Sequence, residues 1–516
     1  MNIRSRTGRT SLNVISSLLS QIIVVVCGLI VPRCLLKAFG SEVYGATTSI
    51  TQFLSYIALI EGGIGGVARS ELYKPLSENN TNKIAIILKS LKSFFFKVGL
   101  IFIIYVLVIG VIFKDISSLE SLDWTTCFFL VIVISISNMG QYFIGMTYGI
   151  LLQADQKNYV INFINAATTI LNTLLVILLV FLDFNVVWVK LISSCVFLLR
   201  PLIYFLYVKK FYKLPKNIEQ EDENSPVLKA KWTGLGQHIA YFVHSNTDIV
   251  LLTLLLDLKI VAVYSVYSLV TLNIQALISS FGSGMEGLFG ELIAKDEKEN
   301  LKNIFSKYVS LLSFISIIIF ATTFILIVPF VKLYTSGIED TNYIYPLFGF
   351  LMVLASFIYI IRLPFQNIVI AAGKFKETNA ASFGEAGINI VISIICVQFF
   401  GIVGVAIGTC VAVTFRYFYY LVYVYKNIVN ENKFNIVKKV VISFVPFVGI
   451  SLLGNFVVGF FEFENYFYWA IGGFATVAAA GLITCIIFVL FNRKDFFDFF
   501  MMIKNKLFRR KNELHN

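Results

Sequence analysis

Residues 158–182 read NYVINFINAATTILNTLLVILLVFL, a run of 25 residues without a charged side chain. A helix needs about 20 apolar residues to cross the hydrocarbon core of a bilayer, so this run predicts a membrane-spanning helix. The whole chain has a related composition, because 58% of its 516 residues are hydrophobic and 14% are charged. Soluble domains average about 45–50% apolar and about 25% charged residues, which excludes an ordinary soluble protein.

The pattern of apolar runs predicts an all-α polytopic membrane protein with fourteen transmembrane helices. The connectors between the runs are short, except for a charged linker that ends near residue 232. The expected spans are 11–32, 42–68, 94–113, 124–152, 158–182, 186–207, 233–256, 260–290, 308–331, 342–372, 378–399, 402–425, 440–459 and 466–491.

Cationic residues are distributed unevenly between successive connectors. When both termini and every second connector are placed on one side, that side carries 31 of the 42 Lys and Arg residues, while the other side carries 5 and the spans carry 6. Because cytoplasmic loops are enriched in Lys and Arg, this split predicts that both termini are cytoplasmic. The net charge of +12 therefore has a topological explanation, and no nucleic-acid partner is expected.

The chain also contains an internal repeat. Residues 200–210 (RPLIYFLYVKK) match 416–426 (RYFYYLVYVYK) at an offset of 216, and Asn172 matches Asn389 at an offset of 217. Spans 1–6 are therefore expected to repeat as spans 7–12, in two six-helix bundles related by a pseudo-two-fold axis along the membrane normal. The predicted domains are an N-terminal bundle (1–210), a cytoplasmic linker (211–232), a C-terminal bundle (233–428) and two extra helices with a basic cytoplasmic tail (429–516).

Polar residues inside the spans are the first candidates for function. Gln237, Tyr241, His244 and Asp248 follow one another at spacings of 4, 3 and 4 residues, which places them on one face of span 7. Such a face should contact protein or a water-filled cavity, since lipid cannot satisfy it. We expect Asp248, with His244 one turn away, to couple transport to an ion, and Glu385 in span 11 to be a second buried carboxylate. Interhelical hydrogen bonding is the alternative role for the amides and hydroxyls.

Four arginines in or beside the spans are the candidate substrate-binding residues: Arg362, Arg69, Arg416 and Arg33. Guanidinium groups bind phosphate oxygens with two parallel hydrogen bonds, so a cavity with several arginines suits a phosphorylated substrate. For Arg416, extension of the side chain to the membrane surface is the alternative. The sequence has no GxxxxGKS, GxxxxGKT, GxSxG or HExxH motif, which predicts a transporter without a built-in ATPase, and no enzyme, cofactor or bound metal.

Four motifs carry a resemblance to a known family: GSEVYG (40–45), NTDIVLL (246–252), VAVYSVYSL (261–269) and GINIVISIICVQFFGIVGVAIGT (387–409). With the fourteen spans and the repeat, they resemble the polysaccharide-exporter branch (Wzx-like O-antigen and capsule repeat-unit flippases) of the multidrug/oligosaccharidyl-lipid/polysaccharide (MOP) flippase superfamily. The resemblance implies a MATE-like pair of bundles with a cationic central cavity. It also implies that the chain moves an undecaprenyl-diphosphate-linked oligosaccharide across the bacterial cytoplasmic membrane for surface-polysaccharide biosynthesis.

The expected partners are the lipid-linked oligosaccharide, membrane lipid, H⁺ or Na⁺ as a coupling ion, and a polysaccharide polymerase. A cation-coupled multidrug exporter of the same superfamily is the alternative function. A membrane-embedded polysaccharide polymerase is less favoured, because such an enzyme needs a catalytic loop on the outer face and the outer connectors here have about ten residues or fewer.

The charge split predicts the sidedness of two loops. In a cysteine-free background, Ser118→Cys should react with a membrane-impermeant thiol reagent in whole cells, whereas Gln220→Cys should not, because Ser118 lies in an outer connector and Gln220 in the cytoplasmic linker. Labelling of the second variant without the first would invert the predicted topology.

Overall fold

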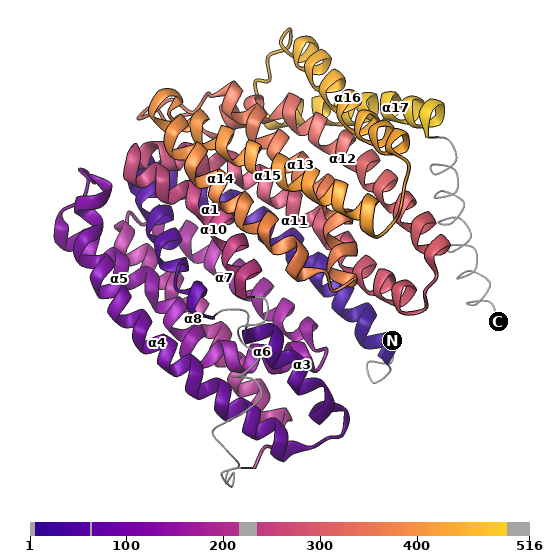
Figure 1. Cartoon of the computed structure of the whole chain (residues 1–516). Coiled ribbons are helices and arrows are strands. Elements are labelled where there is room, and N and C mark those ends of the chain that lie inside the picture. The colour runs from indigo at the N-terminus through magenta and orange to yellow at the C-terminus, as the bar shows by residue number, and fades with distance from the viewer. Residues whose placement is uncertain (1–5, 62–63, 216–234, 493–516) are drawn as a thin grey trace, which may run out of the picture. The chain divides into compact units, whose positions relative to one another are not determined.

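The computed structural model describes residues 6–61, 64–215 and 235–492, which form helices joined by short turns and contain no β-strand (Figure 1). The helices are α1 (Arg6–Ser55), α2 (Ala58–Glu61), α3 (Ile64–Ser77), α4 (Thr81–Ser117), α5 (Trp124–Gly140), the π-helical turn η1 (Gln141–Gly145), α6 (Met146–Ala154), α7 (Asn158–Phe181), α8 (Val186–Phe211), α10 (Leu235–Leu255), α11 (Leu258–Ala294), α12 (Lys298–Tyr334), α13 (Pro346–Ala371), α14 (Phe375–Phe400), α15 (Ile402–Asn427), α16 (Lys433–Val458) and α17 (Tyr466–Phe491).

The predicted all-α fold with fourteen spans is confirmed. Twelve helical runs among the described residues are long and apolar enough to cross a membrane. One of them, Leu12–Glu61, corresponds to the first two predicted spans. The two spans are continuous because α1 is a 50-residue helix, and they are separated by a kink at Gly40, whose backbone angles are not helical. The remaining predicted span corresponds to α10, whose described apolar part, Asn246–Leu255, is shorter.

The second predicted span, 42–68, differs from the expected single helix. After Ser55 the chain makes a turn in which the amide of Tyr56 donates to the carbonyl of Phe53 at 3.1 Å, a bond three residues long in place of the α-helical four. The four-residue α2 follows, and α3 begins at Ile64. The predicted span is therefore interrupted after Ser55.

The break in α1 is capped by a residue that lies about 300 positions further along the chain. Gly40 has φ +79°, in the region that glycine tolerates best, and Ser41 starts the second half of the helix. The amide of Ser41 donates to one carboxylate oxygen of Asp340 at 2.6 Å, and its hydroxyl donates to the other at 2.5 Å. Asp340 therefore caps the N-terminus of the second half of α1.

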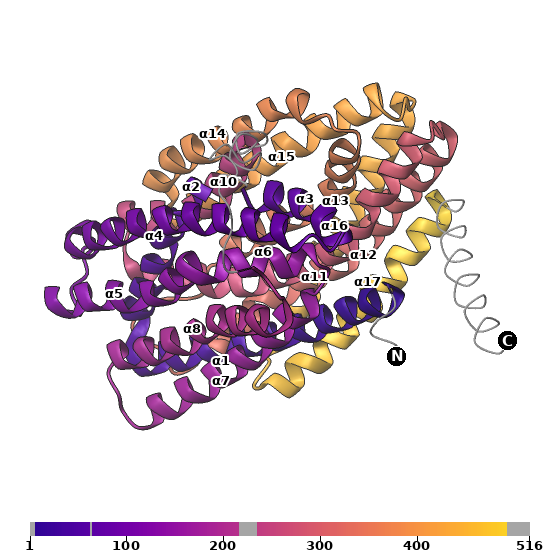
Figure 2. The ribbon, with the colours of Figure 1, turned by 90° about the horizontal axis from the view of Figure 1, so that it is seen from below.

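The helices pack into two compact units. Unit 1 comprises Met1–Ser265 together with Gly337–Thr341, and unit 2 comprises Val266–Ser336 and Asn342–Asn516. Within unit 1, α7 packs along both α1 and α8, as Figure 2 shows. This division follows packing, whereas the predicted domains follow the sequence repeat, so α10 falls in unit 1 although its sequence opens the predicted C-terminal bundle. The predicted boundaries stay a prediction.

Aromatic side chains fill the interior of each unit. In unit 1, Phe53 meets Phe113 edge to face, with ring centroids 5.9 Å apart. In unit 2, Phe357 stacks on Phe447 at 4.1 Å. The last helix, α17, buries only Ala480, Thr484 and Phe488 and presents a nearly continuous apolar surface, as expected of a helix that contacts lipid.

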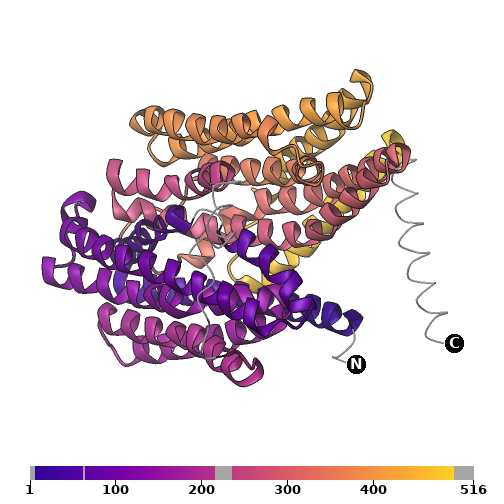
Figure 3. The same ribbon diagram turned by 60° about the horizontal axis from the view of Figure 1, so that its bottom comes forward.

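The hairpin of α14 and α15 is packed backbone to backbone, and its two helices run alongside each other in Figure 3, in orange. A Cβ atom on Gly404 would overlap the backbone of Cys396, and one on Gly408 would overlap the side chain of Ser393. The side-chain amide of Asn389 crosses between the helices and donates to Thr409 at 2.9 Å. This close approach fixes the rotation of the two helices against each other, and with it the direction of every inward-facing side chain.

The close approach can be tested with one methyl group. Gly404→Ala should lower the stability of the purified protein by about 1–3 kcal/mol, because backbone atoms cannot move aside for the new Cβ. Gly387→Ala on the same hairpin is the control, since a Cβ at this position would have no neighbouring atom within 4 Å, and it should be neutral or slightly stabilising. Equal thermal unfolding midpoints for both variants would show that the hairpin is looser than described.

Candidate functional site

Three charged side chains from three helices meet in the interior of unit 2. Arg362 on α13 donates from Nη1 to Oε1 of Glu385 on α14 at 2.5 Å, and Arg416 on α15 donates to the other oxygen, Oε2. Arg362 is 1% exposed, Glu385 is 0% exposed and Arg416 is 5% exposed. We call these three residues the charge triad.

The charge triad has one anion for two cations. Among the described residues, Glu385 is the carboxylate within ion-pair distance of either guanidinium group, which leaves one formal positive charge inside the unit. Tyrosine side chains lie beside both cations, since the guanidinium carbon is 4.7 Å from the ring centre of Tyr359 for Arg362 and 5.1 Å from that of Tyr420 for Arg416. The Tyr420 hydroxyl also accepts a hydrogen bond from Arg416 at 3.0 Å. Aromatic faces and hydroxyls stabilise the surplus cation in part.

The hairpin geometry places two of the three members. Glu385 lies one turn before Asn389 on α14, and Arg416 lies two turns after Gly408 on α15, so the contacts that align the helices also aim these side chains at each other. By contrast, α13 packs mainly against α12 and α15 and touches α14 little. The bond between Arg362 and Glu385 is thus a polar link between two helices that otherwise touch little.

The sequence repeat gives unit 1 a related arrangement in which the arginine has neutral acceptors. Arg200, the repeat partner of Arg416, donates to the hydroxyls of Thr168 at 2.7 Å and Thr169 at 2.8 Å. Thr168 precedes Glu385 by 217 residues, the offset that also relates Asn172 to Asn389. The two repeats therefore share the arginine and differ in its acceptor, which is a hydroxyl in unit 1 and a carboxylate in unit 2.

The other predicted arginines lie in unit 1. Arg69 on α3 is half-buried and donates to the side-chain oxygen of Gln153 on α6 at 2.8 Å. Near it in the chain, Glu61 accepts a hydrogen bond from the hydroxyl of Tyr142, in the π-helical turn, at 2.7 Å. Arg33 is a partly exposed residue of α1 that follows Pro32.

Asp248 is buried in unit 1, where the Tyr264 hydroxyl donates to its Oδ2 at 3.0 Å. Around it, α1 and α10 share a polar seam in which Ser49 and Thr253 exchange a 2.7 Å hydrogen bond and the Tyr56 hydroxyl donates to the carbonyl of Asn246 at 3.3 Å. The other residues of the predicted span 7 stripe, namely Gln237, Tyr241 and His244, lie outside the residues whose side chains the structure describes.

Sequence reasoning found all three members of the charge triad but not their association, because it assigned Arg362 and Arg416 to substrate and Glu385 to coupling. It missed the hydroxyl partners of Arg200 and the Gln153 partner of Arg69. The repeat offset of 217 could have identified the partner of Arg200, since it aligns Thr168 with Glu385. No group of three or more His, Cys, Asp or Glu side chains in the described part of the chain is placed to hold a metal ion.

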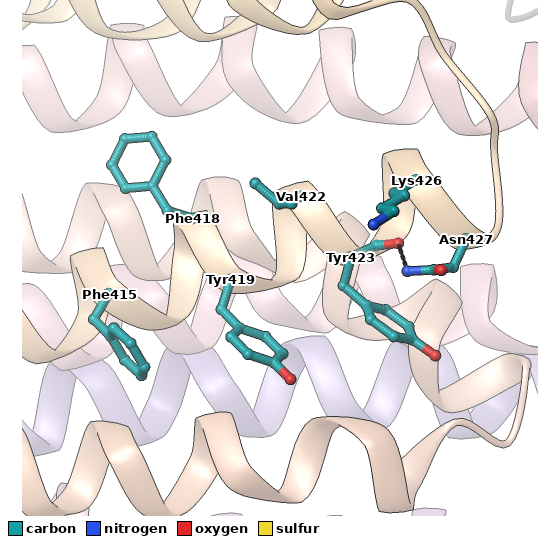
Figure 4. Close-up of a pocket in the computed structure, with 7 residues that line it drawn as sticks. All are labelled: Phe415, Phe418, Tyr419, Val422, Tyr423, Lys426 and Asn427. Atoms are coloured by element: carbon teal, nitrogen blue, oxygen red, sulfur yellow. Dashed lines mark hydrogen bonds between the residues drawn. The ribbon is translucent and has the colours of Figure 1, made fainter.

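The outward face of α15 is different in character. A groove there is lined by Phe415, Phe418, Tyr419, Val422, Tyr423, Lys426 and Asn427 (Figure 4). Its polar groups gather at the end of the helix, where the amide of Asn427 donates to the carbonyl of Tyr423 at 2.9 Å. Arg416 and Tyr420 are buried on the other side of the helix, so α15 separates an apolar surface from a charged interior.

Removal of the single anion should cost more than removal of one cation. Glu385→Gln leaves two buried guanidinium groups without a counter-charge and should destabilise the protein by about 3–5 kcal/mol, the range for breaking a buried ion pair. Arg416→Gln leaves a neutral pair of Arg362 and Glu385 and should be clearly milder. Thermal unfolding of the two variants measures the difference, and the reverse order would contradict the described charge balance.

Comparisons with known proteins agree with this architecture. Residues 235–395 match the MatE family model. The fold is similar to that of the lipid II flippase MurJ in an inward closed conformation, with a TM-score of 0.67, 16% identity and coverage of 94% of this chain and 99% of that chain. It is also similar to the MATE multidrug transporter DinF-BH (TM-score 0.57, 15% identity, 83% and 96% coverage). The Vibrio cholerae MATE transporter VcmN in its bent form is similar as well, with a TM-score of 0.53, 13% identity and coverage of 80% of this chain and 97% of that chain.

No curated protein matches the sequence. The similar structures share the helical fold of this chain. The MatE match over residues 235–395 is independent of the structure, because it compares sequence. The chain is therefore a multi-pass membrane protein with the fold of the MOP-superfamily transporters.

Proposed function

We propose that the protein is a flippase that moves an undecaprenyl-diphosphate-linked oligosaccharide repeat unit across the bacterial cytoplasmic membrane. The observation that carries this proposal is the charge triad, in which two buried guanidinium groups share one carboxylate and leave a surplus positive charge in the interior of a membrane-spanning unit. Burial of a cation is costly unless an anion compensates its charge. The diphosphate of a lipid-linked oligosaccharide is such an anion, and a flippase must carry it through a low-dielectric region.

The similar structures include both a lipid II flippase and multidrug transporters. The similarity to the lipid II flippase extends over 94% of this chain, whereas the similarity to the two drug transporters extends over 83% and 80%. A cation-coupled multidrug exporter is the second candidate, and it is favoured by the MatE match. It would use the aromatic side chains to bind apolar cations, but surplus positive charge in unit 2 is unfavourable for such substrates.

Surface-polysaccharide biosynthesis, of O-antigen or capsule, is the process we propose for the flippase. Both termini would be cytoplasmic, and a polysaccharide polymerase would receive the product on the outer face. A polymerase role for this chain itself has little support, because the connectors that follow α4 and α12 run only from Ser118 to Asp123 and from Thr335 to Tyr345.

Asp248 and His244 are the groups we propose for coupling to H⁺ or Na⁺, since a buried carboxylate in a polar seam of unit 1 can exchange a cation. The variant Asp248→Asn tests this role in a deletion strain. Full complementation with an unchanged response to pH would make Asp248 a structural residue.

Deletion of the gene tests the function itself. The strain should accumulate a diphosphate-linked oligosaccharide on the cytoplasmic leaflet and lose surface polysaccharide, because the lipid-linked unit would no longer reach the outer leaflet. Its resistance to cationic drugs should be unchanged. Drug sensitivity with normal surface polysaccharide would instead support the exporter.

Substitutions of Arg362 and Arg69 distinguish two roles for these side chains, namely binding of phosphate and extension to the membrane surface. We expect Arg362→Lys and Arg69→Lys to reduce surface polysaccharide in the deletion strain nearly as much as the corresponding alanine variants, because an ammonium group lacks the fork geometry that binds a diphosphate. If the arginine only extended to the membrane surface, substitution by lysine would leave the amount of surface polysaccharide nearly unchanged. At matched expression, wild-type polysaccharide from all four variants would remove both residues from the mechanism.

A further inference from the structure

Glu385 makes the same kind of contact with the arginines that a phosphate group would make. It offers two oxygens, and each oxygen accepts one N–H from a different guanidinium group. Carboxylate and phosphate oxygens are interchangeable partners for a guanidinium fork. The arginines keep unused donor capacity, because the Nε atoms of Arg362 and Arg416 have no hydrogen-bond partner among the described residues.

Glu385 is the acid of the charge triad, and cations and tyrosines surround it. Its two ion-pair partners are Arg362 from α13 and Arg416 from α15, and behind them lie the rings of Tyr359, beside Arg362, and Tyr420, beside Arg416. Arginine does not lose its proton in a protein. Glu385 is therefore the member of the charge triad whose charge a proton can remove.

The repeat shows which part of the arrangement is particular to unit 2. Arg200 and Arg416 occupy matching positions, and in unit 1 the hydroxyls of Thr168 and Thr169 accept the hydrogen bonds of Arg200. A carboxylate is thus not required to keep this arginine inside a bundle. Its presence at Glu385, together with a second arginine, calls for a role beyond satisfying hydrogen bonds.

We propose that Glu385 is an internal competitor for the diphosphate that Arg362 and Arg416 bind, and that uptake of one proton by Glu385 releases both guanidinium groups to that diphosphate. The inference rests on the proposed function and deepens it by naming how the substrate's anion is admitted. Protonation converts the carboxylate to a neutral acid and leaves two cations, a state that a diphosphate stabilises. By thermodynamic linkage, proton binding and diphosphate binding then strengthen each other.

Inorganic pyrophosphate is a probe for this exchange with the purified full-length protein. The rise in unfolding midpoint that pyrophosphate produces measures its binding to the folded state. We expect the wild-type protein to bind pyrophosphate more tightly at acidic than at alkaline pH. Simple charge attraction predicts the opposite trend, because phosphate groups lose negative charge as the pH falls.

The variant Glu385→Gln removes the competitor. It should bind pyrophosphate about tenfold more tightly than the wild type at alkaline pH, the change expected from the loss of one charge-assisted contact, and its binding should no longer tighten on acidification. Glu385→Thr supplies the hydroxyl that unit 1 uses at this position and should bind pyrophosphate as the glutamine variant does. The pH dependence of the wild-type protein tests the proposal even if neither variant folds. Glu61→Gln, which alters the hydrogen-bonded carboxylate of unit 1, is the matched control and should keep the wild-type pH dependence.

Two results would overturn the competitor role: equal pyrophosphate affinities in the wild type and both Glu385 variants, or a wild-type affinity that weakens on acidification. The flippase assignment is tested separately by the deletion strain. If pyrophosphate binds as expected but no lipid-linked intermediate accumulates in that strain, the anion site stands and the proposed substrate fails. The converse result would leave the flippase assignment in place and reject the competitor.

Discussion

A single carboxylate shared by two guanidinium groups organises the interior of unit 2. Glu385 joins α13 and α15 to α14, and all three charged residues are almost completely buried. The hairpin packs on α13 mainly through α15, and the ion pair of Arg362 with Glu385 adds a direct polar link from α13 to α14, which otherwise touch little. An arrangement with one charge too many is costly in a membrane, so its presence indicates that the surplus has a use.

The two repeats show how one backbone plan supports two chemistries. The helix pairs α7–α8 and α14–α15 place an arginine and its acceptor at matching positions, yet the acceptor is neutral in one and charged in the other. The backbone contacts that create this geometry, through Gly404, Gly408 and Asn389, belong to the scaffold. The difference in electrostatics depends on the side chains at two positions, Glu385 and Arg362, which is how function is commonly added to a shared fold.

The spans could be predicted from sequence because hydropathy and charge bias are properties of each segment alone. The fourteen apolar runs and their helical state needed no knowledge of tertiary contacts. The charge triad could not be assembled in the same way, since the meeting of Arg362, Glu385 and Arg416 depends on the rotation of three helices. Similarly, the Gln153 partner of Arg69 lies 84 residues away, and no local pattern identifies it. The interruption after Ser55 could not be predicted either, because the break falls at Tyr56 and Ile57, where the sequence has neither glycine nor proline.

The capping of Ser41 by Asp340 has a consequence for the order in which the protein is made. Synthesis proceeds from the N-terminus, so both halves of α1 emerge and enter the membrane long before residue 340 has been translated. During that interval the amide and hydroxyl of Ser41 lack the carboxylate that they bind in the finished protein. Unit 1 includes Gly337–Thr341, so it cannot reach its final structure as an independent early product of the ribosome. Its maturation waits for a segment that lies 299 residues after Ser41 in the chain.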